Sequence, residues 1–213
     1  MALANYTDLL ASVAAWLDRS DLTSVIPDFV ALFEANANTE GAIRTQFNRT
    51  STTLTTTANI NYVTPPTDFL SADSLLVTVP SGPYEVLSPF GGAAGLYTSY
   101  PNAAVATGRP KGYINLASKL ELAPVPDAAY TVTLYYYQKV PALVTNTTNW
   151  LMTNFPQIYL FGTLTAAEAY LGSDPRIQIW GTAYDNAIQK LQGSIDRNKY
   201  GGSPLSVKVD AVA

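Results

Sequence analysis

Near the start of the chain, apolar residues recur every three or four positions, which is the spacing of one face of an α-helix. A first apolar stripe lies within residues 5–18 and consists of Leu9, Leu10, Val13, Trp16 and Leu17. A second stripe consists of Ile26, Phe29, Val30 and Phe33. Ser24 precedes it as a possible cap, and Pro27 suits a first helical turn. The short link between the two helices favours antiparallel packing.

At residue 50 the pattern changes. Residues 50–57 are nearly all Thr and Ser, which are poor helix formers. Short apolar segments then predict strands at 59–63, 69–70, 75–79, 84–87, 113–116, 119–122 and 130–139. The last of these alternates most strictly, and its apolar face is expected to line a core. The many Gly and Pro residues of 88–112 predict a long loop, so we expect an all-antiparallel β region interrupted by that loop.

After Trp150 the helical period returns. Residues 155–172 form one helical stripe, and Asp174 followed by Pro175 is a helix start signal for a second stripe over 177–195. That helix is expected to end near the glycine pair at 201–202. Beyond the glycines, apolar and polar residues alternate as in a strand.

Together these segments predict an α+β fold. Residues 1–49 and 150–201 would form an antiparallel helical bundle, residues 50–149 an inserted antiparallel β domain, and residues 202–213 an extended tail. Large aromatic side chains are expected to be the structural anchors: Trp16, Trp150, Tyr159, Trp180 and Tyr184. We expect Trp150 to fasten the β region to the last helices, so that its loss disturbs folding or assembly.

Composition changes this picture in one respect. Of the 213 residues, 47% are hydrophobic, which is enough for a sizeable core, but only 13% are charged. A sparsely charged surface is typical of a protein whose surface is covered by partners. The alternative is an exposed surface of Thr, Asn, Ser and Gln, which the chain also contains in number.

Candidate chemistry is sparse. The chain has no Cys and no His, which excludes disulfides, thiol nucleophiles and a Ser-His-Asp triad. The acids Asp18, Asp21, Asp28 and Glu34 raise the question of a glycosidase pair, but we interpret them as solvated helix ends. The glycines at 91–92 and 108 lack a following helix and indicate turns, not phosphate loops. We therefore expect no catalytic residue, no metal site and no cofactor.

The charge balance also limits the partners. Net charge is −4, and the twelve basic residues are spread thinly along the chain. We interpret most of the following as surface charges: Arg44, Arg49, Arg109, Lys111, Arg176, Lys190, Arg197 and Lys199. Gripping a phosphate backbone requires clustered cations, so DNA is expected to pass this protein without specific binding. No apolar run approaches the roughly 18 residues of a membrane span, and the first residues lack the features of a signal peptide. We expect no membrane contact.

A run of three tyrosines, Tyr135 to Tyr137, suggests the stacking of sugars or bases. Strand alternation divides these rings between two faces, and Lys139 is the one cation close by in the sequence. We interpret the run as core and interface packing.

The order of these segments closely resembles the adaptor proteins that join portal to tail in tailed bacteriophages. The chain is similar to the tail tubular protein A class of short-tailed phages, also called gp6-like connectors. The resemblance runs over most of the chain and is carried by these segments: Tyr6 to Leu17, Ile26 to Glu34, Pro66 to Leu70, Leu87 to Pro89, Gly108 to Pro110, Leu120 to Leu122, Pro126 to Tyr137, and Asn149 to Leu151 with the helices after it.

The resemblance implies a structural virion protein, made in the cytoplasm of a bacterial host. It implies a ring of twelve copies docked under the portal, with tail or nozzle proteins as further partners and a central channel for DNA ejection. The helical part would face the portal and neighbouring subunits, and the β part would face the tail. Arg44 and Arg49, which close the second helix, could pair with acids in such an assembly.

Two further hypotheses complete the sequence-based interpretation. The residues Leu205, Val207, Val209 and Val212 lie in the alternating tail, which could add a strand to a portal or a neighbouring subunit. The alternative function is a carbohydrate- or cell-binding module of a phage tail, suggested by the tyrosine-rich strand and the segment 88–112.

Overall fold

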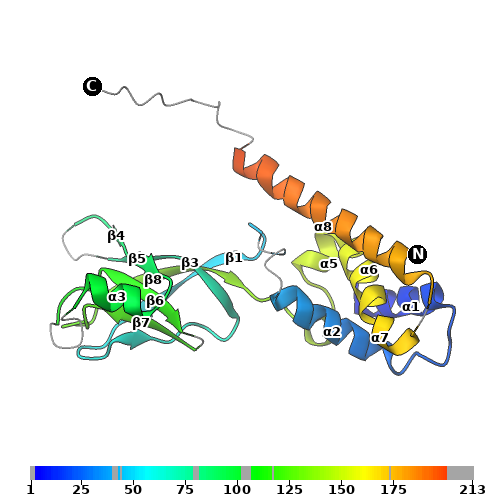
Figure 1. Ribbon diagram of the computed structural model, residues 1–213, viewed down its shortest axis with the longest axis horizontal. Helices are drawn as coiled ribbons and strands as arrows, with labels where there is room; N and C mark the ends of the chain where they lie inside the picture. The colour runs from blue at the N-terminus through cyan, green and yellow to red at the C-terminus, as the bar shows by residue number, and fades with distance from the viewer. Residues whose placement is uncertain are drawn as a thin grey trace. The chain divides into compact units, whose positions relative to one another are not determined.

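A computed structural model describes the backbone of residues 3–39, 43, 45–78, 82–101, 107–116, 118–172 and 174–200, with side chains to residue 195. The chain forms two compact units (Figure 1). The helical unit comprises Met1–Gln46 and Val140–Ala213, and the β unit comprises Phe47–Lys139. The fold is therefore α+β, as the sequence predicts, and the continuous β unit is inserted between two segments of the helical unit.

The helical unit is organised around α6 (Pro156–Ala166), which contacts α1, α2, α5, α7 and α8. The other helices are α1 (Tyr6–Leu17), α2 (Ile26–Thr39), α4 (Leu143–Asn146), α5 (Trp150–Asn154), α7 (Glu168–Leu171) and α8 (Ile177–Tyr200). The two predicted N-terminal helices are confirmed. The side chain of Asn5 caps the first by accepting from the Asp8 N–H at 3.0 Å.

The core of the helical unit takes side chains from both ends of the sequence. Residues of α1 and α2 pack with residues of α5, α6 and α8 in one buried apolar cluster. Close approach of α2 to α6 depends on Gly162, because a Cβ there would lie 2.3 Å from the ring of Phe33. That ring in turn packs edge-on against Tyr159, with 5.1 Å between ring centroids.

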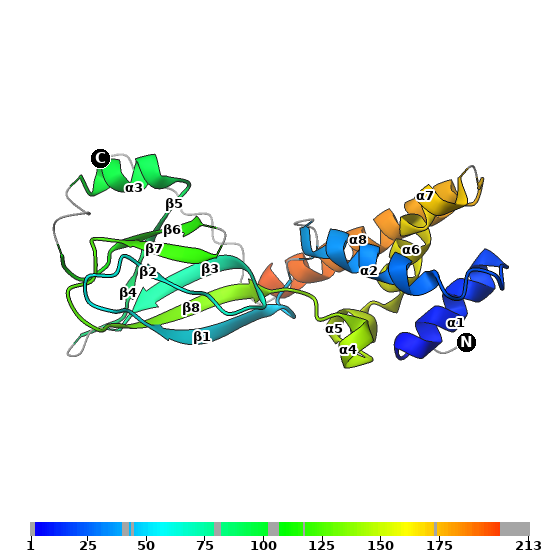
Figure 2. The same cartoon turned by 90° about the horizontal axis from the view of Figure 1, so that it is seen from below.

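Within its described residues, the β unit has two four-stranded sheets (Figure 2). The first has the order β1-β8-β3-β4, from β1 (Arg49–Thr55), β8 (Thr131–Gln138), β3 (Phe69–Val77) and β4 (Glu85–Val86). The second has the order β2-β7-β6-β5, from β2 (Tyr62–Val63), β7 (Lys119–Ala123), β6 (Gly112–Leu116) and β5 (Ser88–Phe90).

The strand β8, which has the strictest predicted alternation, is one of the two inner strands of the first sheet. Val132, Leu134 and Tyr136 are buried and join the main core of the β unit. Tyr135 and its outward neighbours are half-buried or exposed. The two-faced prediction for this strand is therefore confirmed.

Two predictions for the β unit are wrong. The segment 88–112 is not one long loop, because it contains β5 and the helix α3 (Ala93–Ser99). Fully buried Leu96 fixes that helix against Ile114, a contact that local glycine content does not reveal. The region is also not all antiparallel, since β5 pairs with β6 in parallel. The Thr- and Ser-rich residues 50–57, which no strand prediction covered, supply most of β1.

Candidate functional site

In the described part of the chain, the side-chain hydrogen bonds that span more than 100 positions all lie in the helical unit. The first group, here called the Glu34 cluster, comprises Glu34, Asn38, Asn149 and Tyr159. The carboxylate of Glu34 accepts from the Leu143 N–H at 2.8 Å and from the Tyr159 hydroxyl at 3.1 Å. The side-chain oxygen of Asn38 accepts from the N–H of residue 140 at 2.7 Å. Both acceptors on α2 thus hold the chain where it re-enters the helical unit.

The cluster continues from Tyr159 to Asn149. The Asn149 amide donates to the Tyr159 hydroxyl at 2.6 Å and to the Pro141 carbonyl at 2.7 Å. Its oxygen accepts from the Met152 N–H at 2.9 Å and so caps α5. One Asn therefore joins the start of α5, the preceding segment and α6.

Burial governs the ionisation of this cluster. It raises the pKa of Glu34, although the bonds from Leu143 and Tyr159 oppose that rise. Burial, followed by the negative charge of Glu34, also raises the pKa of Tyr159, which therefore remains a neutral donor. The interpretation of Glu34 as a solvated helix end is wrong, because the residue is only 8% exposed. Its donors lie more than 100 positions away in the sequence, where helix periodicity cannot reveal them.

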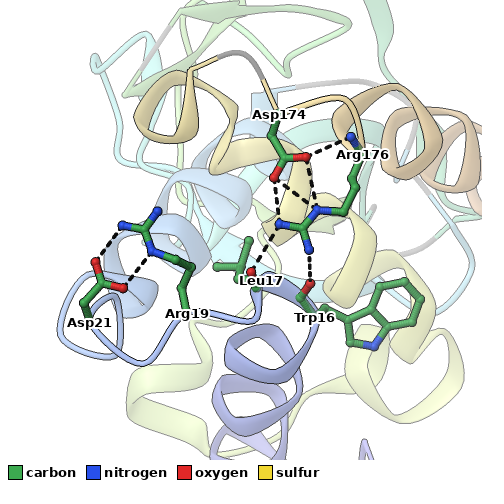
Figure 3. A network of polar contacts seen from close by, with 6 residues as sticks. All are labelled: Trp16, Leu17, Arg19, Asp21, Asp174 and Arg176. Carbon is green, nitrogen blue, oxygen red and sulfur yellow. Dashed lines mark hydrogen bonds and ion pairs between the residues drawn. The ribbon is translucent and has the colours of Figure 1, made fainter.

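The second group joins the end of α1 to the beginning of α8 (Figure 3). The Arg176 guanidinium pairs with Asp174 at 2.7 Å and lies 5.1 Å from the centre of the Trp180 ring. It also donates to the carbonyls of Trp16 at 3.1 Å and Leu17 at 3.2 Å. Carbonyls in the last turn of a helix lack intrahelical donors, so Arg176 supplies partners that α1 cannot. The Arg176 side chain is 43% exposed, so this surface charge also holds the end of α1 to the segment before α8.

The Asp174 side chain forms a hydrogen bond at the start of α8, which explains the helix start signal in the sequence. Its carboxylate accepts from the Arg176 N–H at 2.9 Å, and α8 begins at the next residue, Ile177. Hydrogen bonding from Arg176 lowers the pKa of Asp174 below its usual range. A separate pair, Arg19 with Asp21, is bidentate and exposed beside this group (Figure 3).

The five predicted anchors occupy different environments. Tyr159 is fully buried and Trp180 is 2% exposed. Tyr184 and Trp150 are half-buried and pack against the helical core, and the Tyr184 ring lies edge-on to Phe33. Trp16 is 44% exposed, with its ring edge-on to Phe161 at 5.6 Å.

Of the predicted interface residues, the structure places Arg49 alone. It begins β1, pairs with Asp73 at 2.6 Å and lies 5.9 Å from the centre of the Tyr135 ring. The others lie outside the described residues: Arg44, Leu205, Val207, Val209 and Val212.

Both units expose large apolar side chains. In the helical unit these are Trp16, Leu32, Val144, Tyr170 and Ile179. In the β unit they are Phe47, Ile60, Tyr84, Val86, Tyr97 and Leu116. Single exposed apolar residues are normal on a monomer, so none defines an interface by itself.

The described part of the chain contains no group of three or more acidic, His or Cys side chains placed to hold a metal ion. No described helix combines the length and apolar character that crossing a bilayer requires. The polar groups found in the helical unit join helices to one another, and their chemistry is that of structural hydrogen bonds.

Comparison with known proteins gives one positive result. The family model described as SU10 adaptor protein matches residues 4–208, which is nearly the whole chain and includes both units. Among curated proteins, none matches the chain.

Proposed function

Because the chain belongs to the SU10 adaptor protein family and is thus a structural protein of a phage virion, we propose that it forms a ring joining the portal to the tail. The family match over residues 4–208 carries this proposal. The narrower likeness to the gp6-like connectors of short-tailed phages is part of the same proposal. The ring would contain twelve copies, docked under the portal.

The surface of the chain is consistent with burial between copies. Charged residues are 13% of the sequence, and large apolar side chains are exposed on both units. Interface cores are depleted of charge and enriched in aromatic residues. In the proposed ring, the helical unit contacts the portal and neighbouring copies, and the β unit contacts tail or nozzle proteins.

The charge of the chain suits a DNA conduit. Twelve copies at −4 each would carry about −48, a charge that repels phosphate and keeps DNA mobile. DNA would therefore pass through the channel without specific binding. The negative sign of this charge does not depend on the copy number, because any ring of this chain is acidic.

Contacts to portal or neighbouring copies are assigned to residues 205–212, Arg44 and Arg49. One short strand binds weakly, at roughly 1 kcal/mol net per backbone hydrogen bond, but a ring of such strands gains through effective concentration. Deleting residues 203–213 should leave thermal unfolding unchanged and abolish binding to the portal.

Native mass spectrometry of the full chain, with and without the portal of the same phage, tests the function. We expect a portal complex carrying a ring of adaptor chains. A chain that stays monomeric in the presence of portal rings, at concentrations where the portal is assembled, would contradict the proposal. The deletion variant serves as the comparison, because it separates loss of the tail from loss of the fold.

The outward face of β8 supports a second candidate, a carbohydrate- or cell-binding module. Tyr135 and Tyr137 lie on that face, and aromatic rings with nearby polar groups suit sugar stacking. However, Arg49 lies over the Tyr135 ring, which would have to move for a sugar to stack there. Retention on host glycans that Tyr135→Ala abolishes, without any binding to portal, would favour this candidate.

A further inference from the structure

The strand β1 forms one edge of its sheet (Figure 2). It pairs with β8 from Arg49 opposite Tyr137 to Thr55 opposite Thr131. Just beyond its two ends, backbone bonds join residue 48 to residue 138 and residue 56 to residue 130. Bonded and non-bonded pairs alternate in an antiparallel ladder, so the even-numbered residues of β1 bond to β8. The N–H and C=O groups of its odd-numbered residues therefore point to the opposite, outer edge.

This outer edge lacks the usual protection against pairing. Exposed edges are normally guarded by Lys, Pro, charged side chains or bulges. Residues 50–55 are Thr, Ser and Leu, and their pairing with β8 is regular. In the part of the chain that the structure describes, no strand pairs with the outer edge. It is a seven-residue template for another strand.

The two faces of β1 differ in exposure, and this difference determines which side chains an added strand needs on each face. Arg49 and the other odd-numbered side chains are exposed, whereas Thr50, Thr52 and Leu54 are half-buried. Leu54 packs against the main core of the β unit. At the start of the edge lies a hollow of about 350 Å³, lined by Arg49, Thr50, Ser51 and Tyr135. A fitting strand needs apolar residues on its inner face and polar residues on its outer face.

We propose that the outer edge of β1 accepts residues 205–210 from a second copy of this chain, as an added antiparallel strand. The sequence there, Leu-Ser-Val-Lys-Val-Asp, has the required alternation. Residues 201–213 lie outside the described residues.

One pairing register places suitable side chains on both faces of the added strand. With Asp210 opposite Arg49, the pairs on the inner face are Val209 with Thr50, Val207 with Thr52 and Leu205 with Leu54, all from sequence positions. The outer face then places the Asp210 carboxylate beside a guanidinium that already binds Asp73.

The same register also gives hydrogen-bond partners to the outward N–H and C=O groups of β1. The outward groups of Arg49, Ser51 and Thr53 face residues 210, 208 and 206, which all have an N–H, and three such pairs exchange about six hydrogen bonds. The next position, opposite Thr55, is Pro204, which has no N–H to donate and ends the ladder.

A strand donated by one copy to the next is a head-to-tail contact, and such contacts close into rings when the rotation between copies permits. The inference thus rests on the proposed ring and selects one of the two partners proposed above for the tail, a neighbouring copy. Deleting the tail would then abolish portal binding because the copies no longer assemble into a ring.

Cysteine cross-linking tests the register cleanly, because the chain has no Cys of its own. Opposed residues of a bonded pair have Cα atoms about 5.5 Å apart, which a disulfide can span. A Thr53→Cys, Ser206→Cys variant, assembled on the portal and oxidised, should give a ladder of disulfide-linked multimers on non-reducing gels. The Thr53→Cys, Asp210→Cys variant is the matched control and should give none, because it is four residues out of register.

A mixture of the two single variants, Thr53→Cys and Ser206→Cys, should give linked dimers. A link confined to single chains of the double variant would overturn the proposal, since the acceptor would then be the chain's own edge. Absence of links in fully assembled rings would also overturn it. If no ring forms on the portal, the proposed function fails. Oxidation of free chains at high concentration then still tests the pairing: links between chains support it, and links confined to single chains, or no links, overturn it.

A second variant tests the backbone directly. Proline at position 53 removes an N–H that points outward and leaves the bonds to β8 in place. Thr53→Pro should weaken association between copies at least tenfold relative to Thr53→Val, with circular dichroism and thermal unfolding alike in both. Equal association of the two variants, measured by native mass spectrometry, would overturn the proposal.

Discussion

The β unit joins distant parts of the chain by strand ladders as well as by side-chain bonds, whereas the described elements of the helical unit form no ladder. In the β unit, β8 is bonded along its length to β1 on one side and to β3 on the other. In the helical unit, single side chains span the distance: Glu34 reaches the backbone 109 positions away and Arg176 reaches it 160 positions away. In a strand ladder the stabilising free energy is divided among many equivalent hydrogen bonds, whereas in a side-chain bridge it depends on a single residue. Single substitutions should therefore harm the helical unit far more.

The largest effect is expected at Trp180 in the core of the helical unit. Trp180→Ala should lower the free energy of unfolding by about 3–5 kcal/mol, because it leaves a large cavity. The matched variant Trp16→Ala removes a ring that is 44% exposed and should lower it by less than half as much. Urea unfolding measures both, and equal losses would contradict the burial of Trp180.

The next effect is expected at Glu34. Glu34→Leu leaves the Leu143 N–H and the Tyr159 hydroxyl buried without their acceptor, and should lower the free energy of unfolding by about 2 kcal/mol. Glu34→Gln keeps an acceptor oxygen and should stay within about 1 kcal/mol of the natural chain. A Leu variant as stable as the Gln variant would show that this bridge does not matter.

Glu34 should also give the helical unit a pH dependence. Its pKa in the folded chain lies above the ordinary value of 4.5, so in that window the folded state binds more protons than the unfolded state. The contribution of Glu34 to stability is therefore most favourable at low pH and falls as pH rises past 4.5 through its folded pKa. Glu34→Gln lacks this term, so its stability relative to the natural chain should increase over that window in urea titrations.

The smallest effect is expected on the outward face of the β unit. Thr53→Val keeps the backbone donor and a branched side chain at an exposed strand position opposite Thr133. It should change the free energy of unfolding by no more than about 0.5 kcal/mol. A loss as large as that of Glu34→Leu, in the same urea assay, would remove the contrast between the two units.

The same contrast explains which features the sequence reveals. The helices α1 and α2 and the strand β8 follow from local periodicity, and each is present where it was predicted. The parallel pairing of β5 with β6 could not be predicted, since alternation within a strand is the same for either direction of its partner. The helix α3 was hidden by flanking glycines, and its burial depends on Ile114 in another strand.

The candidate site was harder to predict than the fold. Trp180 and Tyr159 were identified as anchors because large aromatic residues on an apolar stripe tend to be buried. Glu34, Asn149 and Arg176 were missed as bridging residues, because their function depends on partners across the fold. A charged residue inside an otherwise apolar stripe, as at position 34, was the one available signal.

The insertion of the β unit has a consequence for synthesis. Residues 47–139 are continuous, so the ribosome delivers that unit whole, while α1 and α2 must wait for α6 and α8. At about 5–20 residues per second, the delay is on the order of ten seconds. During that time α1 and α2 have only each other as native helix partners, and much of their apolar stripes is open to chaperones. We expect the newly made chain to fold from its middle outwards, with its two ends meeting last.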